Sequence, residues 1–268
     1  MAQKLKQVNN QLLSVVVPVY SCPTIATDLK NVKQSLETLK EPYEIICVVD
    51  GSSSPKDKTF QRALKVQSNN IKVYTYSQNK GKGYAIRYGM AKSYGGIVSF
   101  IDAGSDLEPR GLAMALAHMR WYDADIVVGS KRHRASLVNY PWQRRILSFI
   151  VQLATRFFFG INVSDTQTGL KLFKRGVLKK VLPRLLVKRF AFDLEILAVA
   201  SRLGFNRIYE SPVVLNYNFA STVKLFGKNS VQEFFIDYLA IIYRTHLLRY
   251  YDDAQHDLWK KDPDLRII

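Results

Sequence analysis

Short runs of β-branched and aliphatic residues recur along the first half of the chain, and each run ends in polar or glycine-rich residues. Such runs are typical of buried strands. They lie at 12–17, 44–49, 71–76, 97–101 and 125–128. Apolar residues at helical spacing occupy the stretches between several of them, at 27–39, 84–92 and 109–121. This alternation predicts an α/β fold with a Rossmann-like, mostly parallel sheet and helices on both faces.

The pattern changes after the fifth run. Helical spacing continues at 141–160, 190–203 and 229–251, and strand-like residues follow a loop within 164–175 and recur at 213–217. The residues from Asp252 onward form a polar tail, which we expect to be mobile. No repeat or low-complexity linker divides the chain. We therefore expect one α/β domain over residues 1–227, followed by an amphipathic helical extension with the polar tail over 228–268.

Two carboxylates follow the strand expected at 97–101: Asp102 stands at its end and Asp106 comes four residues later. A carboxylate at the end of a buried strand costs desolvation energy unless a cation pairs with it. In open α/β sheets this edge is also where ligands bind. Asp102 and Asp106 are therefore candidate ligands of a hard divalent cation shared with substrate phosphates. The alternative is a capping role at the helix expected at 109–121, which suits Asp106 more than Asp102.

Two glycine-containing segments follow other expected strands. Asp50 precedes the small residues 51–54, and this arrangement suits a nucleoside, although an ordinary turn has the same composition. Residues 79–83 read NKGKG and offer backbone amides and two ammonium groups near a helix start, as a phosphate site requires. The segment lacks the spacing of a Walker loop, and a solvated basic loop is the alternative.

The chain carries 39 lysines and arginines against 22 acidic residues, for a formal net charge of +17. Such an excess indicates an anionic partner: a phosphorylated substrate, an anionic membrane surface or nucleic acid. Five cations, which suit phosphate oxygens, gather just after the fifth strand: Lys131, Arg132, Arg134, Arg144 and Arg145. A solvated surface is the alternative. Because the cations lie in loops and no recognition motif appears, we expect no nucleic-acid partner.

The sequence also contains information about the localisation of the protein. No run reaches the roughly 18 apolar residues of a membrane-spanning helix, and the N-terminal residues hold no apolar segment of a signal peptide. The nearest run, 146–161, suits either a core helix or a helix lying in a membrane interface. Cys22 and Cys47 indicate neither a disulfide framework nor a zinc site. We expect a protein of the cytosol or of the cytoplasmic face of a membrane.

Seven motifs occur in one order along the chain: SVVVPVY, VDGSS, NKGKGYAIRYG, FIDAGSD, VVGSK, DTQTGLKLF and FDLEIL. Over about residues 12–227 they resemble the family 2 glycosyltransferases of GT-A fold, and most closely the polyprenyl-phosphate sugar synthases of dolichyl-phosphate type. The resemblance implies inverting transfer from a nucleoside-diphosphate sugar, a UDP- or GDP-sugar, to a polyprenyl phosphate. It also implies Mg²⁺ or Mn²⁺ as cofactor. Together with the excess positive charge and the lack of a spanning run, such an acceptor leads us to expect peripheral binding to the cytoplasmic face of a membrane.

The family's motifs carry residue roles over to this chain. On the donor side they imply nucleotide-sugar binding by Pro18, Tyr20, Asp50, Ser52, Asn79, Lys82, Asp102 and Lys224. On the acceptor side they imply phosphate binding by Lys131, Arg144 and Arg145, and contact with the sugar or acceptor by Asp165, Gln167, Asp193 and Glu195. Of these, Asp102, Lys131, Arg144, Arg145 and Asp193, together with Asp106, are the expected catalytic residues.

The main departure from the family's pattern is Gly104, which stands where the second acid of the DxD motif is expected. Glycine has no side chain to bind a metal ion. We therefore expect Asp102 and Asp106 to hold the metal jointly, with Gly104 leaving room for water or the diphosphate. A site with Asp102 alone is the alternative.

Other functions compete with this one. A family 2 transferase with a soluble or polysaccharide acceptor requires a general base, for which Asp193 is the candidate. A lipid phosphate is already an anion and needs charge neutralisation more than a base, which agrees with the excess of cations. An inactive relative that binds anionic ligands is a further alternative because of Gly104.

Overall fold

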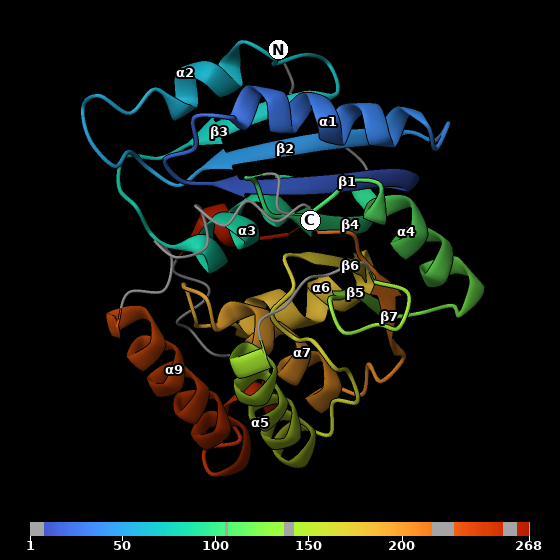
Figure 1. Ribbon diagram of the computed structural model, residues 1–268, viewed down its shortest axis with the longest axis vertical. Coiled ribbons are helices and arrows are strands. Elements are labelled where there is room, and N and C mark those ends of the chain that lie inside the picture. The colour runs from blue at the N-terminus through green and yellow to red at the C-terminus, as the bar shows by residue number, and fades with distance from the viewer. Residues whose placement is uncertain (1–7, 105–106, 137–141, 216–227, 254–261, 268) are drawn as a thin grey trace.

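A seven-stranded sheet runs through the middle of the protein, in the strand order β3-β2-β1-β4-β6-β5-β7 (Figure 1). The computed structural model describes residues 8–104, 107–136, 142–215, 228–253 and 262–267. The strands are β1 (Asn9–Val19), β2 (Tyr43–Val49), β3 (Ile71–Thr75), β4 (Gly95–Ile101), β5 (Ile126–Ser130), β6 (Leu170–Lys174) and β7 (Ile208–Pro212). β6 runs antiparallel to both of its neighbours, β4 and β5, and the other pairs are parallel.

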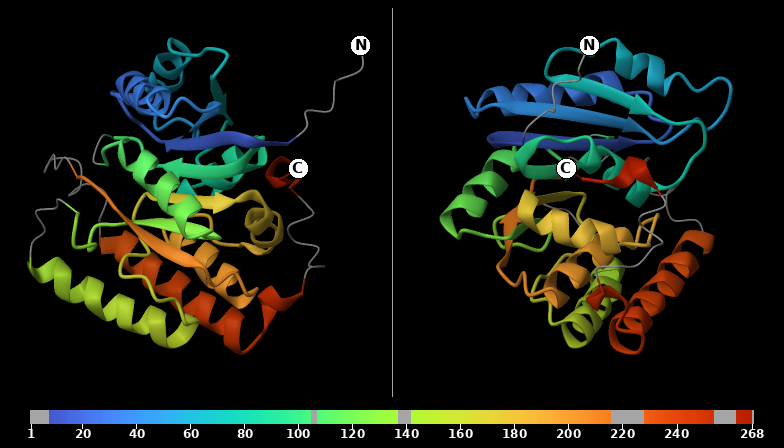
Figure 2. Two further views of the ribbon diagram at one scale, coloured as in Figure 1. Left: turned by 90° about the vertical axis from the view of Figure 1, so that its right-hand side faces the viewer. Right: turned by 180° about the vertical axis from the view of Figure 1, so that it is seen from behind.

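Helices cover both faces of the sheet (Figures 1 and 2). They are α1 (Ile25–Glu37), α2 (Thr59–Leu64), α3 (Lys82–Ala91), α4 (Gly111–Trp121), α5 (Trp142–Phe159), α6 (Arg175–Val181), α7 (Phe192–Arg202) and α9 (Lys228–His246), with short 3₁₀ turns at η1 (Leu182–Arg184), η2 (Tyr250–Asp252) and η3 (Pro263–Leu265). Val15 and Val17 of β1 belong to the core under α1 and α4, whereas Val16 between them belongs to the core with α3 and α7. Because β1 is buried on both faces from Leu13 to Val19, that part of its sequence is apolar apart from Ser14.

The helices α5 and α9 lie side by side at one end of the protein (Figure 2). Thr155 and Tyr238 share a hydrogen bond, Phe159 and Tyr238 pack edge to face, and His246 Nε2 donates to the carbonyl oxygen of Phe158. Tyr238 and Ile241 belong to the core that α7 fills, so α9 is part of the same packed body. Within the described ranges, no helix combines the length and the apolar character needed to cross a bilayer.

Most of the elements predicted from the sequence are confirmed within a few residues, with some differences. The strand predicted at 213–217 is wrong over its described residues, 213–215: β7 ends at Pro212, and Leu215 makes only an isolated bridge to Leu107. The short helices α2 and α6 were not predicted, because a helix of six or seven residues displays little periodicity.

The described end of the C-terminal tail is docked, contrary to the mobile tail predicted. The Tyr84 hydroxyl donates to Asp262 at 2.9 Å, and Lys92 Nζ donates to Asp264 at 3.1 Å. Ile267 packs against the core on the α3 side of the sheet. Polar composition alone suggested mobility, but the two tail carboxylates find partners on α3.

Candidate active site

Asp50 organises the loop that follows β3. Its buried carboxylate accepts hydrogen bonds from the backbone N–H of Lys80 at 2.7 Å, the N–H of Gly81 at 2.9 Å and the Tyr76 hydroxyl at 2.8 Å. Burial and the bond to Asp50 raise the pKa of Tyr76, so its hydroxyl stays a donor. The strand-end carboxylate of Asp50 and the NKGKG segment were predicted as separate features, but hydrogen bonds join them into one site.

The neighbouring loops meet at the same sheet edge. A Cβ at Gly51, which has φ of +67°, would lie 2.5 Å from the backbone nitrogen of Asn79, so the two loops touch only because residue 51 is glycine. The Asn79 amide donates to the carbonyl oxygen of Asp50. Tyr20 is exposed beside the buried Pro18, and Ser52 is exposed with its hydroxyl bound to the Ser54 carbonyl.

Four charged side chains form an alternating chain from the sheet edge into the interior: Asp102, Lys82, Asp193 and Lys171. Lys82 Nζ donates to Asp102 Oδ2 at 2.9 Å and to Asp193 Oδ2 at 3.1 Å. Lys171 Nζ donates to Asp193 Oδ1 at 2.5 Å and to the Thr168 carbonyl at 2.7 Å. Lys171 and Asp193 are buried, so each requires the other's charge.

Asp193 is held as a carboxylate. Burial alone would raise its pKa, but the charges of Lys171 and Lys82 outweigh burial and lower the pKa of this carboxyl below its usual value. The pKa of Lys82 is raised, because Asp102 and Asp193 together outweigh its own desolvation. A carboxylate bound by two ammonium groups is a weak proton acceptor.

Asp102 packs tightly on the start of β6. Its N–H donates to the Gly169 carbonyl at 2.9 Å, and a Cβ at Gly169 would lie 2.0 Å from Asp102 Oδ2. Asp102 Oδ1 is enclosed and has no hydrogen-bond partner among the described residues, and the same is true of Gln167 Nε2 and Thr168 Oγ1. Three unpaired polar atoms on adjoining segments are typical of a site that a ligand completes.

The metal predicted from the sequence can be tested against these atoms. The Asp102 carboxylate, with a side chain 37% exposed, fits a hard divalent cation, which accepts one or two carboxylates and takes its other ligands from water and phosphates. Among the described residues no group of three or more acidic, histidine or cysteine side chains could hold a metal ion. Asp106 lies outside the described residues, so a joint site with Asp102 stays a prediction.

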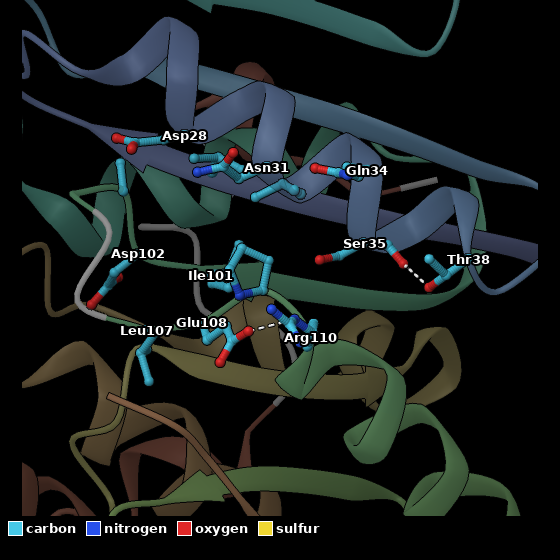
Figure 3. Close-up of a pocket in the computed structure, with 14 residues that line it drawn as sticks. Asp28, Asn31, Gln34, Ser35, Thr38, Ile101, Asp102, Leu107, Glu108 and Arg110 are labelled. Atoms are coloured by element: carbon cyan, nitrogen blue, oxygen red, sulfur yellow. Dashed lines mark hydrogen bonds and ion pairs between the residues drawn. The ribbon is translucent and has the colours of Figure 1, made fainter. Parts of the chain in front are cut away.

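Gly104 has a conformational reason to be glycine. Its φ is +106°, and its N–H donates to Asp28 Oδ2 at 3.1 Å. Asp28, buried on α1, also accepts from the Thr24 hydroxyl at 3.0 Å. Asp28 and Asp102 lie at the same end of a hollow of about 540 Å³ between α1 and the segment after β4 (Figure 3). The missing second acid therefore coincides with a turn that Asp28 fixes.

Restoring the family's second acid is expected to harm the protein. Gly104→Asp should lower the free energy of unfolding by about 1–3 kcal/mol, the cost of this backbone region for a residue with a side chain. No described atom lies within 4 Å of the added Cβ, so no neighbour of that Cβ would hold the new side chain in place. Mn²⁺ titration and thermal unfolding of Gly104→Asp and Gly104→Ala check this. Tighter Mn²⁺ binding by the aspartate variant than by the alanine variant would contradict it.

The predicted acceptor side is assembled around Asp165. Its carboxylate accepts from the Lys131 N–H at 3.3 Å and the Gln167 N–H at 3.1 Å, which ties the loop after β5 to the loop before β6. Arg132 Nη1 donates to Gln152 of α5 at 2.5 Å and to the Ser164 carbonyl at 3.4 Å. The loop after β5 is thereby bound to α5.

Besides Asp106, three predicted residues cannot be followed to their side chains. Arg144 and Arg145 belong to the first turn of α5, but their side chains lie outside the described part, and Lys224 lies outside the described residues. The basic cluster thus stays a prediction, although α5 and the loop carrying Lys131 are adjacent.

The structure gives Glu195 a different place from the predicted one. It is fully buried, and its carboxylate accepts from the N–H groups of Leu186 and Val187 and from the Tyr251 hydroxyl. Burial raises the pKa of this carboxyl despite these donors. Glu195 therefore joins the loop before α7 to the C-terminal residues and presents no oxygen to a ligand.

Lys171 and Gly169 are the residues that sequence reasoning missed. Both lie in DTQTGLKLF, where Lys171 interrupts an apolar strand. A lysine at a buried strand position needs a carboxylate partner, and this was the available signal. That Gly169 packs on Asp102 follows only from the antiparallel pairing of β6 with β4.

The sequence matches the family model of glycosyl transferase family 2 over residues 14–182, a range that begins within β1 and includes β2 to β6. The chain therefore belongs to glycosyl transferase family 2. Asp50, Lys82, Asp102 and Lys171 all lie inside the matched range, and Asp193 follows it.

Its relatives include enzymes named for lipid-phosphate acceptors. The dolichyl-phosphate beta-glucosyltransferase of Dictyostelium discoideum is 30% identical over 210 residues, which cover 74% of this chain and 64% of that protein. The enzyme of the same name from Saccharomyces cerevisiae is 32% identical over 228 residues, with 75% and 66% covered. An undecaprenyl-phosphate mannosyltransferase of Micrococcus luteus is 26% identical, with 74% and 81% covered. The chain thus spans just under two thirds of the length of the two glucosyltransferases.

Solved structures share the fold. The glucosyl-3-phosphoglycerate synthase of Mycobacterium tuberculosis, in complex with Mn²⁺, UDP and glucosyl-3-phosphoglycerate, matches with a TM-score of 0.64 and 19% identity over 87% of this chain and 80% of that one. A mannosyltransferase of Pyrobaculum calidifontis, in complex with GDP-Man and Mn²⁺, matches with a TM-score of 0.53 and 19% identity over 78% and 58%. The predicted GT-A type of α/β fold is confirmed.

Proposed function

We propose that this chain transfers a sugar, with inversion, from a nucleoside-diphosphate sugar to a polyprenyl phosphate. The observation that carries the proposal is the state of Asp193, the carboxylate placed to act as a general base. Two lysines bind it and lower its pKa, which makes it a poor base for a hydroxyl acceptor. A phosphate acceptor is already ionised and requires no base. The names of the relatives agree with such an acceptor.

In this proposal, some of the described residues bind the donor and others bind the acceptor. On the donor side, Asp50 and the 79–83 loop form a wall suited to the nucleoside, and Lys82 and Asp102 stand where the diphosphate and a divalent cation would meet. A bound Mg²⁺ or Mn²⁺ would neutralise the diphosphate as it leaves. On the acceptor side, Gln167, Thr168 and the loop of Lys131 lie beside Asp165 and offer donors to a sugar or phosphate.

A donor screen tests this function. The purified protein is incubated with UDP-, GDP- and dTDP-sugars labelled in the sugar, with a polyprenyl phosphate and Mg²⁺ or Mn²⁺. Label is expected in the organic extract with one class of UDP- or GDP-sugar. If no donor labels the lipid, although a soluble phosphorylated or hydroxyl acceptor becomes labelled, the proposed acceptor class is wrong.

We further propose that the protein works peripherally on the cytoplasmic face of a membrane and docks through α5 and α9. Exposed apolar side chains on α9 recur at helical spacing: Phe235, Ile236, Leu239 and Tyr243, followed by Leu247. On α5, Leu153 and Phe157 are exposed four residues apart. The two helices lie side by side at one end of the protein (Figure 2), so both stripes belong to elements of that end, as an interfacial surface requires.

Acidic substitutions on the apolar face of α9 should weaken membrane binding. The double variant Ile236→Glu with Leu239→Glu is expected to sediment several-fold less with vesicles containing anionic lipid, because two apolar contacts are lost and negative charge is added. The matched control is Met114→Glu with Trp121→Glu, since both are exposed apolar residues on α4. Equal loss in the two double variants, or no vesicle binding by the unmodified protein at low salt, would contradict the assignment.

A further inference from the structure

We propose that Lys82 is an exchangeable counter-ion: it holds Asp102 while the donor is absent, and the divalent cation displaces it toward the donor diphosphate. The proposal rests on the proposed function for the identity of the diphosphate. It concerns a competition between the protein's own ammonium group and the metal for one carboxylate oxygen. Three observations carry it: which oxygen of Asp102 is accessible, what remains on Asp193, and how the charges balance.

The accessible oxygen of Asp102 is the one that Lys82 holds. The Asp102 side chain is 37% exposed, yet Oδ1 is enclosed, which leaves Oδ2 as its accessible polar atom. Lys82 Nζ donates to this Oδ2 at 2.9 Å. A cation that arrives from solvent therefore meets an oxygen already neutralised by an ammonium group. A metal ion that binds Oδ2 therefore competes with Lys82 for that oxygen.

If Lys82 moves away from Asp193, Lys171 still pairs with that carboxylate. A buried carboxylate without a cation is strongly destabilising. Asp193 keeps Lys171 at 2.5 Å, and Lys171 is also anchored to the Thr168 carbonyl. Lys171 is fully buried, whereas the Lys82 side chain is partly exposed at the start of α3. One lysine is thus the permanent partner of Asp193, and the other is free to exchange.

The charges of the cluster cancel in the absence of ligands. Two carboxylates face two ammonium groups, so a divalent cation alone would leave the site positive, and a diphosphate alone would bring uncompensated negative charge. When both arrive, their charges largely offset each other. Asp102 then binds the metal and Lys82 is released to the diphosphate oxygens. The cluster therefore favours metal and donor together over either one alone.

The exchange predicts opposite effects of one substitution. Lys82→Met removes the competitor from Asp102 and a cation from the diphosphate site. It should tighten binding of Mn²⁺ alone by about tenfold, within the usual range of coupling between neighbouring sites, and weaken binding of UDP or GDP alone by a similar factor. If Lys82 served only local packing, its substitution would weaken the binding of both Mn²⁺ and the nucleotide.

Mn²⁺ binding is measured by electron paramagnetic resonance without nucleotide, and UDP and GDP binding by calorimetry without metal. Lys82→Gln serves as a second variant, because its amide still donates a hydrogen bond to Asp102 without the charge. The matched control is Lys92→Met, which removes the same charge from the far end of α3, where Lys92 pairs with Asp264. Thermal unfolding shows whether each variant is folded, and the control should change neither affinity.

Tighter Mn²⁺ binding by both folded Lys82 variants supports the exchange. Unchanged or weaker Mn²⁺ binding by them overturns it, whatever happens to the nucleotide. Failure of the unmodified protein to bind UDP or GDP, even with Mn²⁺, would instead count against the proposed function, and the Mn²⁺ comparison would still decide the role of Lys82.

Discussion

Asp102→Asn is expected to lower turnover by at least about a hundredfold while leaving the fold intact. The loss of one preorganised electrostatic contact to the charge that develops in the transition state has this magnitude. Asparagine preserves the shape of the side chain, so the contact with Gly169 remains, but it removes the charge that pairs with Lys82 and would bind a metal. Steady-state transfer rates at saturating donor and metal measure the effect.

Asp123→Asn is the matched control, because that carboxylate is exposed and pairs with Lys174 and Arg207 outside the site. It should leave turnover unchanged. Excess EDTA should abolish transfer by the unmodified protein, and added Mg²⁺ or Mn²⁺ should restore it. Full activity in EDTA, or near-normal turnover of Asp102→Asn, would show that Asp102 does not serve a metal.

Gly169→Ala should be nearly as damaging through sterics alone. The added Cβ would lie 2.0 Å from Asp102 Oδ2 and 2.3 Å from its Cγ, so the Asp102 carboxylate must move. A displacement of about 1 Å at a reacting centre can cost about a hundredfold in rate. We expect a loss of that order in turnover, together with weaker Mn²⁺ binding, because the displaced carboxylate is the candidate metal ligand.

Gly176→Ala controls for the substitution itself, since no described atom lies within 4 Å of a Cβ at Gly176. It should leave turnover and Mn²⁺ binding at their original values. If Gly169→Ala retains most of its activity with a normal thermal transition, the contact between Gly169 and Asp102 does not position the site.

The fold was predictable where burial determines the sequence pattern. β1, β2 and β4 are covered on both faces over most of their length, and they are therefore mostly apolar runs that end at the polar residues of the site. Asp50 and Asp102 could be placed at one sheet edge for the same reason. The reversed direction of β6 could not be predicted, because a short buried strand has the same apolar pattern in either direction.

The features of the site that could not be predicted depend on contacts between segments distant in the sequence. Lys82 and Asp193 meet across 111 positions of sequence, and only the fold brings them together. Asp193 and Glu195 stand two residues apart in FDLEIL, yet Asp193 joins the charged cluster and Glu195 binds backbone N–H groups of the loop before α7. Side chains two residues apart on a helix lie on nearly opposite faces, which explains why the prediction for Glu195 was wrong.

A comparison of two acceptors tests the proposed function most directly. The unmodified protein, with the donor that proves active and Mg²⁺ or Mn²⁺, is offered a polyprenyl phosphate and the matching polyprenol in parallel, and the extracted lipids are analysed by mass spectrometry. Because the site holds Asp193 bound by two lysines, we expect one hexosyl group on the phosphorylated lipid and none on the alcohol. Equal transfer to both lipids, or transfer to the alcohol alone, would contradict the account.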